Sequence, residues 1–436
     1  MFIERIKRGP DVAIGRWPRR LLVAALMSAA SAAALAQPDA LGASVQGLLE
    51  YARTQSPEFA AMRQEADAAA QRVQPAGALP DPVLRVELMN INNYGNDASP
   101  SLLPWRVGET RYTLMQMLPG WGKRDLKRDV ASADAKQAAA RAQATWAELA
   151  ARVKSTYAEQ YRVAGNERLT REVLDLMSRL EQVAQARYAG GLVAQQDAIR
   201  AQLEQTAMRS ELIMIENEKR QLRARLNALL ARDAAAPLAD PQVLRPLPTL
   251  ATADAARLAE RARASNPQLQ AELARLASAQ KSRDLTFRNR NPDFQVGVLP
   301  TQMRSRITTW GLMLEMNIPL QQESRRSQER EAEAMVSAAR SRSDALSQQL
   351  LGELAGNLAA LDAARRTEAL VTSELLPQSQ LTLQSALAAY ENGKVDFATL
   401  LDAQRQIRKA RLDLLKAQVE AQMRLADIER LLGEDL

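Results

Sequence analysis

Two short stretches hold the side chains whose types and spacing could do chemistry: YAGGLVAQQDAIRAQ at 188–202 and YENGKVDFATLLDAQ at 390–404. Each sets glycine into a long helical pattern and a carboxylate several residues later, Asp197 in the first and Asp402 in the second. A glycine readily takes the left-handed conformation that ends a helix, and negative charge is favoured where the next helix begins. The chemistry that such carboxylates could do is the attraction of cations. From the residues alone, however, the favoured interpretation is that Asp197 and Asp402 are ordinary solvated helix side chains.

Composition argues against catalysis. The chain of 436 residues has no cysteine and no histidine, which removes thiol and imidazole chemistry and the common zinc, haem and iron–sulfur ligand sets. No nucleophile–base pair and no glycine-rich phosphate loop stands out, so an enzyme is the least favoured class, and neither a cofactor nor a metal site is expected. Lysine and arginine are interleaved with glutamate and aspartate, so nucleic acid is not an expected partner.

The N-terminal 36 residues have the pattern of a secretory signal. Residues 1–20 carry six basic and two acidic side chains, a net charge of +4, and residues 21–36 are apolar and end in Ala-Leu-Ala. A basic segment, a short apolar run and an A-x-A site predict a signal peptide at 1–36, cleaved after Ala36. The run is short for a membrane span. The prediction is an exported chain that is not lipidated through cysteine.

The helices and extended segments that must position the two stretches form an internal repeat. LLEYARTQSP at 48–57 matches LAERARASNP at 258–267, and YTLMQMLP at 112–119 matches LMLEMNIP at 312–319. Each half therefore predicts the same order, which is helix, extended pair, very long helix, glycine break and long helix. The predicted units are a first repeat at 37–235, a proline-rich linker at 236–250 and a second repeat at 251–436.

Four segments alternate between polar and apolar residues, as Leu84, Val86 and Leu88 do with Arg85 and Glu87. A period of two over about ten residues, with tryptophans near the ends, is typical of outer-membrane strands, and a small soluble sheet is the alternative. In lipid an open sheet edge leaves backbone groups unsatisfied, so four strands that cannot close alone would require an oligomer. The predicted strands are at about 82–91, 109–118, 293–299 and 307–318.

The long helices have coiled-coil spacing. From Lys123 to Ala189 the chain has no proline and only Gly165, which predicts a helix of roughly 100 Å. Its apolar residues step by four and three, which is the spacing of a seam between helices. The predicted seam is Leu169, Val173, Leu176, Leu180 and Val183.

Over nearly the whole mature length the chain resembles the TolC-type outer-membrane efflux proteins. The resemblance rests on the duplicated helix–strand–strand–helix plan and on the paired motifs GLVAQQD at 191–197 and Y-x-x-G…LLDAQ at 390–404. It implies a homotrimer with a twelve-stranded outer-membrane barrel continuous with an α-helical barrel that holds most of the mass in the periplasm of a Gram-negative cell. It also implies outer-membrane lipid, a periplasmic adaptor protein and an inner-membrane RND pump as partners.

The resemblance assigns roles to the opening stretches, which become hairpin turns at the inner end of the tunnel. Asp197 and Asp402 match pore-constricting aspartates, and three-fold rings of carboxylates favour cations. Tyr390 matches a gating tyrosine, Thr399 stands where well-known members have a second aspartate, and Val395 stands where they have an arginine. The turns where an adaptor would dock are Gly190, Gly191, Leu192, Asn392, Gly393 and Lys394.

The segments at 78–90 and 117–131 look most like the heavy-metal branch of that family. Six of the fourteen methionines fall in the extended pairs. Thioether sulfur suits soft ions such as Cu(I), although methionine also fills apolar faces. The expected cargo is heavy-metal cations such as copper or silver, with drugs as the alternative. A type I secretion duct and a rod-like periplasmic coiled-coil protein remain alternative functions. The six methionines are Met89, Met115, Met117, Met303, Met313 and Met316.

Overall fold

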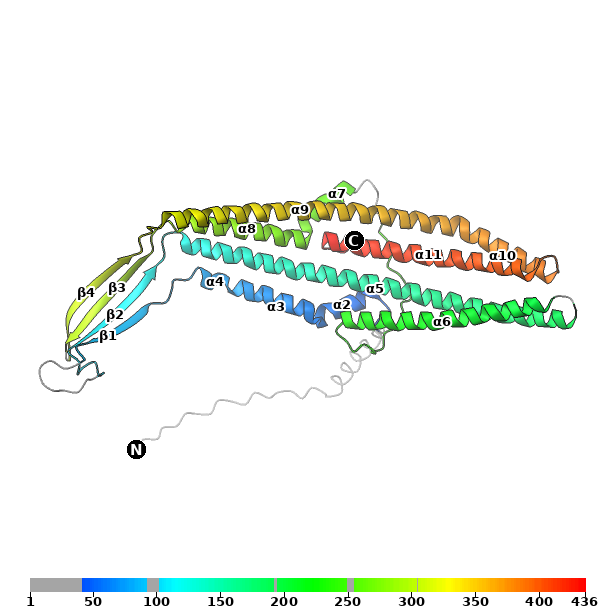
Figure 1. Cartoon of the computed structure of the whole chain (residues 1–436), viewed down its shortest axis with the longest axis horizontal. Helices are drawn as coiled ribbons and strands as arrows, with labels where there is room; N and C mark the ends of the chain where they lie inside the picture. Colours follow the sequence, from blue (N-terminus) through cyan, green and yellow to red (C-terminus); the bar gives the residue numbers. More distant parts are fainter. Residues whose placement is uncertain (1–40, 92–101, 192–193, 249–254, 304) are drawn as a thin grey trace, which may run out of the picture.

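The computed structural model describes residues 41–91, 102–191, 194–248, 255–303 and 305–436. The predicted signal peptide and Leu192 lie outside these residues. The described part is a long bundle of helices with a four-stranded sheet at one end and two helical hairpins at the other (Figure 1). The prediction of a mainly helical chain with a small β part is confirmed.

In chain order the elements are α2 Val45–Gln55, α3 Pro57–Gln71, α4 Val73–Ala76, β1 Val83–Met89, β2 Glu109–Leu118, α5 Lys123–Ala189, α6 Gln195–Leu229, α7 Ala255–Ser265, α8 Pro267–Arg288, β3 Phe294–Met303, β4 Arg306–Met316, α9 Gln322–Leu370, the π-helix η2 Val371–Leu375, α10 Leu376–Glu391 and α11 Phe397–Leu432.

The matched Ser-Pro and Asn-Pro pairs of the two halves each begin a helix. Proline occupies the first turn of α3 and of α8, where a missing N–H costs no hydrogen bond. The Asn266 side chain accepts from the Leu269 N–H at 2.8 Å, and Ser56 does the same for Phe59 at 3.4 Å. Asn266 also donates to the Leu431 carbonyl at 2.9 Å, so it caps the start of α8 and the end of α11 together.

The sheet is antiparallel in the order β1-β2-β3-β4. Its register aligns four apolar residues, one from each strand, in a single row. All four are exposed, from 40 % for Val298 to 89 % for Leu312. Because side chains alternate between faces, the sheet presents one apolar face along its length. The row is Leu84, Leu114, Val298 and Leu312.

Three strands differ in extent from the sequence prediction, and β4 runs over Arg306–Met316 instead of 307–318. The third continues to Met303 instead of ending at 299 and includes Pro300. Between Thr301 and Val298, this strand does not pair with β2. Pro300, which has no backbone N–H, lies in this gap of the hydrogen-bond ladder. The first strand ends at Met89 instead of 91, because Asn90 takes a positive φ of 51°.

The seam of α5 is rotated from the predicted positions. Val173 and Leu180 are buried as expected, but Val183 is 42 % exposed and Leu176 is only half-buried. The helix packs against α6 and α11 at once, so its buried line turns toward both partners. The buried line runs through Thr170, Val173, Met177, Leu180 and Ala184.

A buried cluster of charges joins the two halves to the linker. The Glu429 carboxylate, with 2 % of its side chain exposed, accepts from Lys154 of α5 at 2.8 Å and from both terminal nitrogens of Arg245 at 3.1 Å. Lys154 also contacts Asp435. Each charge in this cluster has a partner of opposite sign, as burial requires.

Among the helices that the structure describes, none combines the length and the apolarity needed to cross a membrane.

Candidate functional site

The second hairpin turns in a complete Schellman motif. Gly393 follows the last turn of α10 with a φ of +69°. Its N–H donates to the Tyr390 carbonyl at 3.0 Å, and the Lys394 N–H donates to the Ala389 carbonyl at 2.8 Å. These two bonds satisfy carbonyls at the end of α10, whose C-cap is Asn392.

The first hairpin uses its glycines in the same way. Gly190 caps α5, and Gly191 has a φ of +72° with its N–H on the Tyr188 carbonyl at 2.9 Å. A methyl group at Gly191 would meet nothing within 4 Å. The backbone conformation, not a lack of space, therefore makes glycine suitable here.

Asp396 is the N-cap of α11. The sequence patterns did not select this residue. Its carboxylate accepts from the Thr399 hydroxyl at 2.6 Å and from the Thr399 N–H at 3.0 Å. Both bonds hold the pKa of the Asp396 carboxyl below its ordinary value, and the bond from the Thr399 hydroxyl has the larger effect. Thr399 is thus the capping partner of Asp396. An aspartate three residues before a threonine, at the start of an apolar run, is a signal that could have revealed the pair.

Tyr390 is the centre of the tip and is 2 % exposed. Its ring lies edge-on to Phe397 at 5.5 Å, and the Arg187 guanidinium lies over it at 5.2 Å. The same guanidinium donates to the Tyr390 carbonyl at 2.6 Å, so one side chain of α5 holds the end of α10. Burial, and next the nearby Asp197 carboxylate, raise the pKa of the Tyr390 phenol.

The two predicted aspartates have different surroundings. Asp197 is half-buried in the first turn of α6, and burial is the main cause that raises its pKa. The Asp396 carboxylate raises that pKa further, whereas Arg200 and Arg187 lower it. Asp402 is exposed on the second turn of α11.

One arginine lies beside Asp402. Arg405 approaches its carboxylate at 4.0 Å and is itself paired with Glu204 of α6 at 2.9 Å. The structure therefore brings Asp197, Tyr390 and Thr399 into one neighbourhood, through Arg187 and Asp396. It leaves Asp402 exposed on α11 of the second hairpin, outside this neighbourhood.

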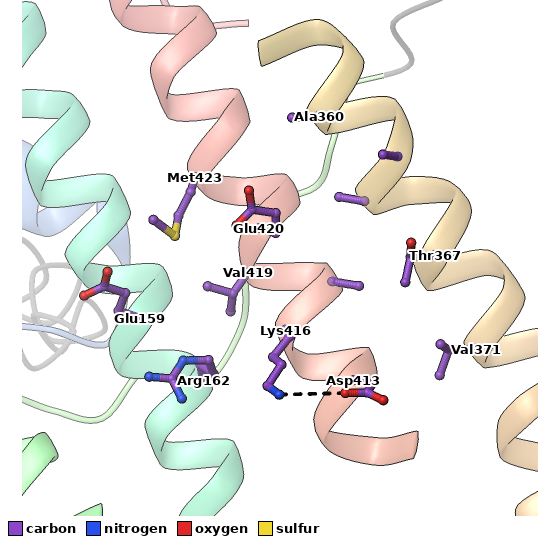
Figure 2. Close-up of a pocket in the computed structure, with 13 residues that line it drawn as sticks. Glu159, Arg162, Ala360, Thr367, Val371, Asp413, Lys416, Val419, Glu420 and Met423 are labelled. Atoms are coloured by element: carbon purple, nitrogen blue, oxygen red, sulfur yellow. Dashed lines mark ion pairs between the residues drawn. The ribbon is translucent and has the colours of Figure 1, made fainter. Parts of the chain in front are cut away.

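A groove of about 740 Å³ lies away from the tips, between α5, α9 and α11 (Figure 2). Val419 and Met423 of α11 lie between charged side chains of α5 and an alanine-rich face of α9. Lys416 pairs with Asp413 at 3.8 Å along its edge. The groove offers an apolar surface with scattered charges. Among the described residues, no group of three or more His, Cys, Asp or Glu side chains could hold a metal ion.

The sequence matches the family described as outer membrane efflux protein over residues 48–232 and 258–434. No curated protein matches it. Among solved structures it resembles the outer membrane protein VceC from Vibrio cholerae, with 18 % identity, 90 % of this chain and 96 % of that chain covered, and a TM-score of 0.74.

Two further structures are similar. A membrane protein from Pseudomonas aeruginosa has 20 % identity, 91 % coverage of both chains and a TM-score of 0.75. CusC, a protein studied for its transmembrane channel formation, has 15 % identity, covers 89 % of this chain and 92 % of its own, and has a TM-score of 0.75. These likenesses establish the fold, and the sequence match covers most of both halves. The chain belongs to the outer membrane efflux protein family.

Proposed function

We propose that this protein is the outer-membrane exit duct of a tripartite RND efflux system. It receives substrate from an inner-membrane pump and a periplasmic adaptor and passes it across the periplasm and the outer membrane. The observation that carries the proposal is one chain with an apolar sheet face at one end and a charged double hairpin at the other. Family membership supports the same placement. The chain reaches this location through the signal peptide at 1–36.

The proposal includes a homotrimer. The chain carries exposed apolar side chains on α6 and on the run from α9 to α10, which lie on opposite sides of the bundle (Figure 1). Two different edges that recognise each other form a head-to-tail contact, and such contacts close into rings. Three copies would give twelve strands whose apolar faces meet outer-membrane lipid. The edge residues are Ile199, Leu203, Ile213 and Met214 on one side and Leu370, Leu375 and Leu381 on the other.

The hairpin tips are proposed as the constriction and the adaptor contact. Asp197 and Asp402 would form carboxylate rings around the axis, and Tyr390 with Thr399 would hold the hairpins in place. The exposure of Gly190, Gly191, Asn392, Gly393 and Lys394 supports their use as a docking surface, together with Leu192.

Heavy-metal cations are the proposed cargo, supported by the resemblance of the strand segments and by carboxylates that attract cations. The two repeats at 37–235 and 251–436, with the linker at 236–250, are the proposed units of the duct. Loss of the protein should raise sensitivity to copper or silver salts. Raised sensitivity to drugs alone would favour a drug duct instead.

The proposal is tested by purifying the mature chain from the outer-membrane fraction and measuring its mass by native mass spectrometry and its conductance in a planar bilayer. We expect a trimer whose cation selectivity falls in Asp197→Asn and in Asp402→Asn. Asp175→Asn is the matched control, because it removes an exposed carboxylate about 20 Å up α5. A soluble monomer from the periplasm would contradict the duct.

A further inference from the structure

Basic side chains gather where the strands pass into the helices. Lys127 lies in the second turn of α5, just after β2, and Arg326 and Arg330 lie in the first turns of α9, just after β4. All three are exposed. Arg288, at the end of α8, lies against Gly122 at the same junction. The starts of α5 and α9 and the end of α8 meet the sheet together (Figure 1).

Three of these cations form no close ion pair. Other charges at the junction are paired within the chain: Lys123 with Asp293 at 2.8 Å, and Arg290 with Glu329 through two bonds. Within the described ranges, no carboxylate oxygen lies within 4.0 Å of the three side chains that we call the junction cations. The junction cations are Lys127, Arg326 and Arg330. Two of them still act on these carboxylates from a greater distance, because Lys127 lowers the pKa of Asp293 and Arg326 lowers that of Glu329. The third, Arg330, donates to the Arg326 carbonyl and to the Ser327 hydroxyl at 3.3 Å each.

Both halves of the duplicated chain place cations in the second or third turn of the helix that follows the strands, beyond the first turn in which the helix dipole acts. At the shift of 200 that aligns the halves, Lys127 falls on Ser327 and Arg326 on Leu126. Both helices that follow the strands therefore carry exposed cations near their starts, but not at residues that the internal repeat aligns.

Exposed apolar side chains lie beside the junction cations. Trp121 is 89 % exposed, Leu320 is 80 % exposed and Ile318 is 60 % exposed, all between the strands and the helices. Tryptophan is favoured where an apolar region meets a wet one. Along the molecule the surface therefore changes from apolar strands, through this apolar and aromatic rim, to cations. That is the order in which a lipid leaflet presents acyl chains, interface and phosphates.

We propose that the junction cations bind the phosphate groups of acidic phospholipids, of the phosphatidylglycerol class, in the leaflet that faces the helices. This inference rests on the proposed function for the placement of the sheet in the membrane. A guanidinium matches a phosphate with two parallel hydrogen bonds, and a lysine adds a point charge. The chain has no cysteine for a lipid anchor, so these contacts fix its height in the leaflet without a covalent bond.

The test uses purified full-length protein in nanodiscs that contain phosphatidylglycerol and phosphatidylcholine. Native mass spectrometry counts the lipids of each kind that stay bound to the released protein. The variant is Lys127→Gln/Arg326→Gln/Arg330→Gln. The control is Lys136→Gln/Arg340→Gln/Arg342→Gln, which likewise removes one exposed lysine and two exposed arginines, farther along the same two helices.

We expect the wild type and the control to prefer phosphatidylglycerol and the variant to lose roughly tenfold to a hundredfold of that preference. High salt should weaken the wild-type preference, which tests the inference without any substitution. Equal lipid preference in all three proteins would overturn it. A changed ion selectivity with an unchanged lipid preference would also overturn it, because the cations would then line the lumen. A protein that forms neither trimer nor channel would instead contradict the proposed function.

Discussion

Arg187 contacts the backbone and the ring of Tyr390 and lies close enough to Asp197 to lower its pKa. We expect Arg187→Gln to loosen the second hairpin, at a cost of about 1 kcal/mol for a half-exposed charged hydrogen bond. Hydrogen exchange of the amides around Gly393 should then speed up, and the open probability of single channels should rise. Arg179→Gln, at an exposed position of the same helix, is the control. Unchanged hydrogen exchange in Arg187→Gln would show that Arg187 does not stabilise the second hairpin.

Asp197 gives the tip a dependence on pH. Burial first, and Asp396 next among the effects that raise it, place its folded pKa above the ordinary aspartate value. The folded state therefore binds this proton more tightly than the unfolded chain, and ionisation of Asp197 opposes folding at higher pH. As pH falls, Asp197 therefore loses its charge at a higher pH than an ordinary aspartate does.

The resulting prediction concerns selectivity. Cation selectivity of the wild-type channel should begin to fall at a higher pH than that of Asp197→Asn, which lacks the tip carboxylate whose pKa is raised. The measurement is the reversal potential across a salt gradient at a series of pH values. Superimposable pH profiles for the two proteins would place Asp197 outside the conduction path.

Sequence reasoning selected Asp197 and Tyr390 through motifs, and their place in the constriction stays a prediction. It could not find Arg187, because that side chain acts on a residue 203 positions away and belongs to no motif. The internal repeat also has a limit. Tyr188 and Tyr390 are equivalent by sequence, yet Tyr188 is 47 % exposed and Tyr390 is buried. Identical residues in the two halves have different neighbours.

Among the elements, the join between α8 and α11 depends on one amide. Asn266 is 2 % exposed and bonds both the Leu269 N–H and the Leu431 carbonyl. Asn266→Ala should cost about 2 kcal/mol and lower the thermal midpoint of the purified protein. Ser56→Ala should cost about 1 kcal/mol, because Ser56 caps only α3. Equal losses in both variants would mean that the bond to Leu431 contributes nothing.

The element boundaries show what periodicity can predict. Alternation revealed all four strands, because one face of each is apolar. It ended the third strand at 299, but the strand continues through Pro300, whose missing N–H lies where the pairing with β2 is interrupted. Spacing also predicted a seam on α5, but spacing carries no information on whether a helix has one partner or two. Because α5 also packs against α11, its buried line lies at other positions than the predicted seam.

At the scale of the whole molecule, assembly should depend on the apolar edges. Ile213 is 70 % exposed on α6, at one of the two proposed edges. Ile213→Asp would place a charge in the contact between copies, so we expect loss of the trimer in native mass spectrometry. Val243→Asp is the control, because Val243 is 72 % exposed on the linker, outside either edge. A trimer of Ile213→Asp with wild-type stability would place the contact elsewhere.

The pairing of Lys154 with Glu429 spans 275 positions of the chain. Loop closure over that distance costs entropy before any contact is made, and topologies rich in such contacts fold slowly. The first half of the chain, with Lys154, is synthesised long before Glu429, whose carboxylate pairs with that lysine in the folded protein. Until Glu429 is available, we expect Lys154 to stay hydrated and the interior around it to stay unpacked. Folding of the first half should then wait for the end of the chain, and the waiting half is the form that a chaperone or a protease would meet first.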